Sequence, residues 1–216
     1  EVPVSSQGGP ALADLDGDGT VEIIVGARVW NADGTFRCEG RAPSGNTSIV
    51  VDLDLDGVPE IVAGHVAYRS DCSVYWVSAP PQAGGTIFHY AAIGQLDSDA
   101  HPEVVVHSIS DVYVLEHDGT PKWRYTHNGA SGFSGSISIA DVDGDGQSEI
   151  ATRVGTDLVV LETNGSVRWT ANTGDFTPHS SGTTTADLDG DGRAEVIHRD
   201  GIELRIFDGV DGTVLY

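Results

Sequence analysis

Five short loops contain most of the side chains in this sequence that could bind a metal ion. In its full form each loop reads Asp-x-Asp-x-Asp-Gly-x-x-Glu, and the copies begin at residues 14, 52, 95, 141 and 187. Alternate residues of such a tight loop can turn several carboxylates and one backbone carbonyl toward a single point. Calcium takes six to eight oxygen ligands at roughly 2.3 to 2.6 Å. The sequence therefore predicts a series of calcium loops.

The expected ligands occupy positions 1, 3, 5, 7 and 9 of each loop, and the residue at position 7 contributes its backbone carbonyl. In the four intact copies they are Asp14, Asp16, Asp18, Thr20 and Glu22; Asp52, Asp54, Asp56, Val58 and Glu60; Asp141, Asp143, Asp145, Gln147 and Glu149; and Asp187, Asp189, Asp191, Arg193 and Glu195.

The third copy departs from this pattern. Gln95 replaces the first Asp and Ala100 replaces the turn Gly. Its remaining candidate ligands are Asp97, Asp99, His101 and Glu103. We therefore expect about four calcium sites, with a fifth that is weak or absent at residues 95–103.

An EF-hand has the same first six loop positions, but it places a bidentate Glu at position 12 and is flanked by helices. Here the Glu stands at position 9, and β-prone runs such as Glu22-Ile-Ile-Val and Glu103-Val-Val-Val follow it. These runs lack a helical period. The sequence therefore favours a strand after each loop and excludes the EF-hand and other helical calcium pairs.

A second periodic signal lies downstream of each loop, where a turn pair divides two strand-like runs. The pairs are Asp33-Gly34, Asp71-Cys72, Asp118-Gly119, Asn164-Gly165 and Asp211-Gly212. Such Asp-Gly and Asn-Gly pairs are typical of type I′ hairpins. Five residues after the first turn residue stands one recurring position, which we call the slot: Cys38, Trp76, Trp123, Trp169 and Tyr216. We interpret its aromatic residues as packing groups of the outer strand.

Loop starts 38, 43, 46 and 46 residues apart fit a repeat of one four-stranded blade. One such sheet cannot bury both of its faces, so neighbouring blades must stack around an axis. The predicted fold is an all-β propeller with five blades in a single domain, 1–216. The repeats lie at about 5–43, 44–80, 84–128, 132–174 and 178–216.

The loop and its place between the first and second strands resemble the FG-GAP or VCBS repeats of integrin-alpha propellers and secreted bacterial proteins. This resemblance implies a ring of seven or eight blades, and roles in adhesion, glycan binding or carrying other modules. The final strand stops in the slot at Tyr216. We therefore expect a covalent continuation into further blades or self-assembly, with a closed five-bladed ring as the competing interpretation.

The charge balance supports the metal interpretation. The chain has 33 acidic and 11 basic residues, a formal net charge of −22, and more than half of the acids stand in the loops. Without a cation these clusters repel one another, so metal binding should stabilise the fold. The small number of Lys and Arg residues argues against a nucleic-acid partner. Its longest apolar runs are of strand length, so we expect no membrane insertion.

The sequence has two cysteines, Cys38 and Cys72, in adjacent repeats. An even cysteine count and calcium loops suit an extracellular, cell-surface or periplasmic location, where a disulfide can form. We expect these cysteines to pair, with two buried free thiols as the alternative.

Three classes of function remain open, and the sequence assigns no catalytic residue. The favoured hypothesis is a secreted, calcium-braced binding or adhesion module with a glycan or protein partner. The second is the propeller of a polysaccharide lyase acting on acidic polysaccharide. The feature that favours it is a row on the second strands that could bind an acidic sugar or assist proton abstraction: His107, Arg153 and Arg199. This row is also the candidate ligand-binding set. The third is a structural stalk or display module without a ligand.

Overall fold

The computed structural model of the chain describes residues 9–42, 45, 47–78, 90–108, 110–128, 134–174, 182–201 and 203–216. Every secondary-structure element assigned within these residues is a β-strand. The described part of the chain therefore contains no helix that could cross a membrane.

The strands form five antiparallel sheets that follow one another along the chain. We number these sheets as blades 1 to 5. Blade 1 contains β1 (Ala11–Ala13), β2 (Glu22–Val25), β3 (Arg28–Trp30) and β4 (Phe36–Glu39). Blade 2 contains β5 (Ile49–Val51), β6 (Glu60–Ala63), β7 (Val66–Tyr68) and β8 (Val74–Val77). Blade 3 contains β9 (Tyr90–Gly94), β10 (Glu103–His107), β11 (Asp111–Leu115) and β12 (Pro121–Thr126).

Blade 4 contains β13 (Ser134–Ala140), β14 (Glu149–Val154), β15 (Asp157–Leu161) and β16 (Val167–Asn172). Blade 5 contains β17 (Gly182–Ala186), β18 (Glu195–Arg199) and β19 (Leu204–Phe207). A single antiparallel bridge from Phe207 to Val214 marks the place of its fourth strand. The described strands thus follow the predicted order of loop, second strand, third strand, hairpin and fourth strand.

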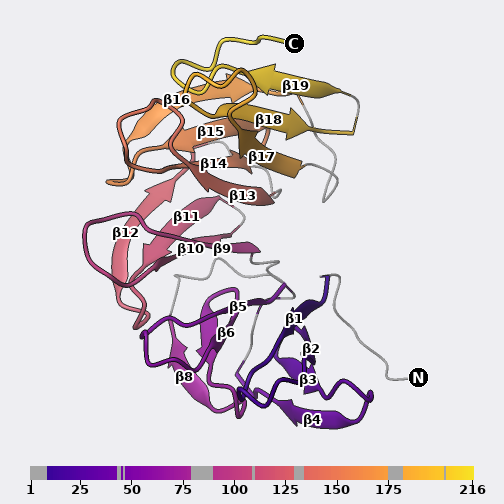
Figure 1. The fold of residues 1–216 in the computed structure, drawn as a ribbon. Helices are drawn as coiled ribbons and strands as arrows, with labels where there is room; N and C mark the ends of the chain where they lie inside the picture. The colour runs from indigo at the N-terminus through magenta and orange to yellow at the C-terminus, as the bar shows by residue number, and fades with distance from the viewer. Residues whose placement is uncertain are drawn as a thin grey trace.

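The five blades lie along an arc (Figure 1), with the first strands on its inner side and the fourth strands on its outer side. Consecutive first strands contact one another, as β9 does with β13 and β13 with β17. Four apolar clusters fill the space between successive blades. The second strands β6, β10 and β14 are buried along their whole length, because both of their faces are covered. The predicted all-β propeller of stacked blades is therefore confirmed.

The hairpin turns lie where the sequence predicts them, but the predicted type I′ geometry is wrong. In blade 1 the N–H of Gly34 donates to the carbonyl of Asn31 at 2.8 Å, and the N–H of Asn31 donates to the carbonyl of Thr35 at 2.9 Å. Gly34 has a φ of 83°, whereas Asp33 is not among the residues with positive φ. This is a three-residue hairpin, a type I turn followed by a left-handed glycine. Asp33 favours it because its carboxylate accepts the N–H of Thr35 at 2.9 Å.

The aromatic residue of the slot packs on the next blade, not only within its own. The indole Nε1–H groups of Trp76, Trp123 and Trp169 donate to the carbonyls of His117, Thr163 and Gly209, each in the following blade. A Cβ added to the next turn glycine would lie within 2.8 Å of the ring in all three cases. Each Trp therefore joins one blade to the next across a glycine.

Blades 1 and 2 are joined by a disulfide at this same place. Cys38 occupies the slot of blade 1, and Cys72 occupies the glycine position of the blade 2 turn. Their Cα atoms lie 6.0 Å apart and the two sulfurs are bonded. Cys72 adopts a positive φ of 66°, the conformation that glycine has in the other turns. The disulfide thus replaces the Trp-on-Gly contact of the other junctions.

Leu55 also has a positive φ, 59°, and it is half exposed in the loop at residues 52–60. The residues at the same loop position, Gly17, Gly144 and Gly190, are all glycines with positive φ. A left-handed conformation costs a residue with a Cβ about 1 to 2 kcal/mol.

We therefore expect Leu55→Gly to raise the free energy of unfolding by about 1 kcal/mol, which corresponds to roughly 2 to 4 °C in melting temperature for a domain of this size. Urea and thermal unfolding would measure it. Val58→Gly, in the same loop but not at a positive φ, is the matched control and should lower stability. A gain from both substitutions would contradict the conformational explanation.

Candidate metal centres

Each loop lies between the first and second strands of its blade, and its Glu begins the second strand. We number the loops 1 to 5 after their blades. In all five, Oε2 of this Glu accepts the backbone N–H of loop position 2, at 2.9, 3.0, 2.6, 2.9 and 2.8 Å. All five glutamates are buried. One oxygen of each Glu thus closes the loop, a role that the sequence did not reveal. The other oxygen, Oε1, pairs with Arg37, Arg69 and Lys122 in blades 1, 2 and 3.

The Asp at position 1 organises the loop from its other end. In loop 1 the carboxylate of Asp14 accepts the N–H groups of Gly17 and Gly19, both at 2.8 Å. The hydrogen bond from Gly19 is the largest factor that lowers the pKa of Asp14. Asp141 accepts the equivalent bonds from Gly144 and Gly146 in loop 4. The loop backbone therefore holds a charged carboxylate in place.

Carboxylate oxygens converge in every loop. The groups whose ligand atoms lie within 4.8 Å of one another are Asp14, Asp16 and Asp18; Asp52, Asp54 and Asp56; Asp97, Asp99, Glu103 and Glu116; Asp141, Asp143 and Glu149; and Asp187, Asp189 and Asp191. In blade 1 a cavity of about 450 Å³ is lined by Asp16, Asp18, Thr20 and Glu22, together with its hairpin. Positions 3, 5, 7 and 9 therefore face one space, as a hard cation requires.

Glu149 in loop 4 gives the clearest sign that a cation belongs there. Its side chain is fully buried, and Oε1 has no hydrogen-bond partner among the described residues. Burial raises the pKa of Glu149 to about 7, and the charges of Asp143 and Glu162 add to this effect. A buried oxygen without a donor is costly in the metal-free protein. The donor set of loop 4 therefore fits calcium, which would coordinate Glu149 and the two aspartates near it.

A row of cations on the fourth strands faces the loops, and it was not predicted from the sequence. Arg37, Lys122 and Arg168 each stand one residue before the slot, and each pairs with the Asp at loop position 3. Arg168 lies 2.6 Å from Asp143, for example. In blade 2 Tyr75 takes this place, and Arg69 approaches loop 2 instead. The regular spacing before the slot is the signal that would have found them.

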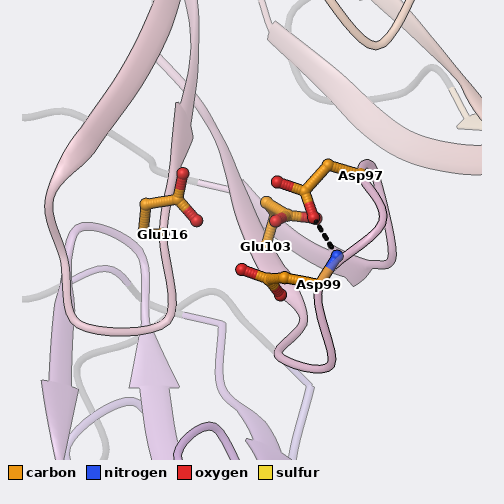
Figure 2. A group of neighbouring side chains, drawn as sticks. All are labelled: Asp97, Asp99, Glu103 and Glu116. Atoms are coloured by element: carbon orange, nitrogen blue, oxygen red, sulfur yellow. Dashed lines mark hydrogen bonds between the residues drawn. The ribbon is translucent and has the colours of Figure 1, made fainter.

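In loop 3 the cation is a lysine that pairs with three acidic side chains, whereas Arg37 in blade 1 pairs with two, Asp16 and Glu22. Figure 2 shows Asp97, Asp99 and Glu103 of the loop gathered opposite Glu116 of the hairpin. Nζ of Lys122 pairs with Asp97, lies 2.9 Å from Glu116 and lies 3.4 Å from Glu103. Burial lowers the pKa of Lys122, but the bonds to Asp97 and Glu116 outweigh it and raise the pKa above its usual value. This ammonium group supports the expectation of weak or absent calcium at residues 95–103.

We expect Lys122→Ala to lower the free energy of unfolding of the metal-free protein by about 2 kcal/mol, because three carboxylates lose their shared counter-charge. Calcium should then restore more stability to this variant than to the wild type. Urea unfolding in chelator and in calcium measures both effects. Arg124→Ala removes a more exposed pair with Asp111 and should cost under about 1 kcal/mol, without added calcium dependence. Equal losses in the two variants would argue against a cation role for Lys122.

The predicted row of His107, Arg153 and Arg199 is not brought together on a surface. His107 and Arg153 are fully buried, whereas Arg199 is exposed. Nδ1 of His107 lies 3.1 Å from the hydroxyl of Thr152 in the next blade. His198, which stands beside this row, has its Nδ1 atom 3.1 Å from the hydroxyl of Thr183 on the neighbouring strand of its own blade. His107 therefore packs between two blades, and His198 is bonded within its own sheet.

Comparison with known families identifies one repeat directly. Residues 95–152 match the FG-GAP-like repeat. The segment contains loops 3 and 4, so the resemblance drawn from the loop pattern is confirmed there. No curated protein sequence matches the chain.

Solved structures of the same architecture come from several kinds of protein. The V. cholerae biofilm matrix protein Bap1 is 18% identical, with a TM-score of 0.68 over 98% of this chain and 61% of its own. A rhamnogalacturonan lyase of Bacillus licheniformis is 20% identical, with a TM-score of 0.69 over 98% of this chain and 50% of its own. A lectin of Agrocybe aegerita that recognises terminal N-acetylglucosamine is 18% identical, with a TM-score of 0.55 over 95% and 64%. At these identities the similarity establishes the fold alone.

Proposed function

We propose that this chain is a calcium-braced β-propeller module of a secreted protein and that the module binds glycan. The observation that carries the proposal is the convergence of carboxylates at the same place in all five blades. The intact loops 1, 2, 4 and 5 hold calcium through positions 1, 3, 5, 7 and 9. Loop 3 is held by Lys122.

Two further observations support a secreted location and a glycan partner. The disulfide between Cys38 and Cys72 suits an oxidising compartment, and loops that depend on calcium suit an extracellular location. Proteins of the same fold include a biofilm matrix protein, a polysaccharide lyase and a glycan-binding lectin. The last two are proteins of carbohydrate chemistry. This chain spans 61% of Bap1 and 50% of the lyase, so activities of those whole proteins are not carried over.

We do not propose a lyase activity for the described residues. Such a role would depend on the row of His107, Arg153 and Arg199, and two of these side chains have no exposed surface. A polysaccharide chain could not reach them without separating the blades.

The test has two stages. Calorimetric titration of calcium into the chelated protein is expected to find about four sites. The calcium-loaded protein is then screened on an array of neutral and acidic glycans, and the screen is repeated in chelator. Binding that requires calcium supports the proposal. Four calcium sites without binding on the array would leave the structural display module as the better description.

A further inference from the structure

A groove separates blades 3 and 4 on the side where the loops and hairpins lie. Its volume is about 930 Å³, which is within the range of small-molecule sites. Loop 3, β12, loop 4 and the hairpin between β15 and β16 all contribute to its walls. The residues that matter here are Gln95, Ser98, Trp123, Gln147, Ser148 and Asn164.

Trp123 is more exposed than the tryptophans at the equivalent position of other blades. Trp76 and Trp169 are 8% and 7% exposed, whereas Trp123 is half-buried and lines the groove. Its ring is nevertheless fixed, because Nε1–H donates to the carbonyl of Thr163 at 2.6 Å and the ring packs on Gly165. The groove therefore contains a rigid apolar surface that needs no ordering when a ligand binds.

Neutral polar side chains surround this ring. Gln95 and Ser98 come from loop 3, Gln147 and Ser148 from loop 4, and Asn164 from the hairpin. Amides and hydroxyls supply both donors and acceptors. A pyranose sugar has a matching character, with one apolar C–H face and a rim of hydroxyl groups.

The charges of the groove favour a neutral ligand. The charged residues that line it are Asp97 and Lys122, and these are paired with each other. Lys122 is also held by Glu116 and Glu103, so its ammonium group is already neutralised. The formal net charge of −22 would in addition repel an acidic polysaccharide.

We propose that this groove is a binding site for a neutral pyranose unit of a polysaccharide, with Trp123 contacting the C–H face of the sugar. The inference rests on the proposed glycan-binding function and assigns that function a place and a class of ligand. Polar contacts come from the amide and hydroxyl side chains on the two loop walls.

The same assignment explains the altered sequence of loop 3. Nε2 of Gln95 donates to the carbonyls of Asp97 and Asp99, so the loop is held by an amide where the other loops use a carboxylate. With Lys122 as its internal cation, this wall keeps its shape without metal. The opposite wall differs, because Gln147 stands at position 7 of loop 4, where the backbone carbonyl is an expected calcium ligand. Sugar binding in the groove should therefore require calcium in loop 4.

The experiment is calorimetric titration of cellohexaose, mannohexaose, xylohexaose and chitohexaose into the calcium-loaded protein, with hexagalacturonate as the anionic comparison. Trp123→Phe keeps an aromatic ring on Gly165 and should weaken binding of the best neutral ligand about tenfold. Trp169→Phe makes the same change at a buried equivalent position outside the groove and should leave affinity unchanged. Gln147→Ala, at an exposed residue, should weaken binding by about three- to tenfold, whereas Thr20→Ala at the same position of loop 1 should not.

The outcomes separate this inference from the function on which it rests. Selective loss in Trp123→Phe and Gln147→Ala supports the groove. Wild-type binding that neither variant weakens overturns the groove and leaves glycan binding intact. Tighter binding of hexagalacturonate than of every neutral oligosaccharide overturns the neutral-sugar assignment. An absence of binding by the wild type, both to these oligosaccharides and on the array, overturns the glycan function itself, and the groove assignment with it.

Discussion

Removing calcium is expected to lower the melting temperature of this protein by roughly 20 °C or more. A ligand that binds only the folded state at 100 times its dissociation constant contributes about 2.7 kcal/mol per site. Four such sites together contribute about 11 kcal/mol, and each kcal/mol corresponds to roughly 2 to 4 °C in a domain of this size. The metal-free loops add repulsion between converging carboxylates to this loss. Thermal unfolding in calcium and in chelator measures the difference.

Two matched substitutions locate this effect in the loops. Glu149→Gln removes the negative charge of a buried carboxylate, whose Oε1 lacks a partner in the described structure. The amide oxygen of the new side chain can still accept the N–H of Val142. We expect the metal-free variant to be more stable than the wild type and to gain less from calcium. Glu103→Gln makes the same change in loop 3, where it loses an ion pair with Lys122. It should be less stable without metal, with an unchanged calcium gain.

Magnesium is the control ion. It requires near-ideal octahedral geometry and releases its water reluctantly, so a loop that supplies most of the ligands should favour calcium. An equal stabilisation by magnesium would indicate general charge screening by divalent ions. If Glu149→Gln and Glu103→Gln change the stability of the metal-free protein in the same direction, loops 3 and 4 do not differ in the way expected from the position of Lys122.

The sequence was sufficient for the elements that repeat locally. The loops, the strands after them, the hairpin positions and the slot all recur at similar spacing. The loops and hairpins depend on residues within one blade, whereas the slot residue contacts the next blade, which the sequence did not indicate. The hairpin type was wrong because Asp-Gly pairs suit two turns, and the choice here involves the bond from Thr35 to Asp33, which the pair alone does not reveal.

Features that join two segments were harder to predict. Arg37 and Arg168 pair with loop residues that stand 21 and 25 residues earlier in the chain, so neighbouring sequence does not indicate their partners. The groove beside Trp123 depends on how two blades stack, and its walls come from four separate segments. The buried state of His107 follows likewise from the neighbouring blade, because strand periodicity gives the face of a strand but not what covers it.

The second large effect concerns the disulfide between blades 1 and 2. Its cysteines are 34 residues apart in the sequence, and a cross-link that closes a loop of this size typically contributes about 2 to 4 kcal/mol. We expect Cys38→Ala with Cys72→Ala to lower the free energy of unfolding by about 3 kcal/mol. In Cys38→Ala with Cys72→Gly the loss should be about 1 kcal/mol smaller, because glycine relieves the positive φ of residue 72. Urea unfolding of each variant in calcium gives these values.

The other blade junctions suggest a replacement for the disulfide. At three junctions a Trp in the slot lies on the glycine of the next turn, where no Cβ would fit. Cys38→Trp with Cys72→Gly rebuilds that arrangement, so it should recover most of the stability lost in the alanine pair while remaining insensitive to reducing agent. The wild type should become about 3 kcal/mol less stable on reduction. Cys38→Trp alone is the control, since Cys72 keeps the Cβ that would meet the indole. If the double variant is no more stable than Cys38→Trp alone, the Trp-on-Gly contact and the disulfide are not equivalent ways of joining two blades.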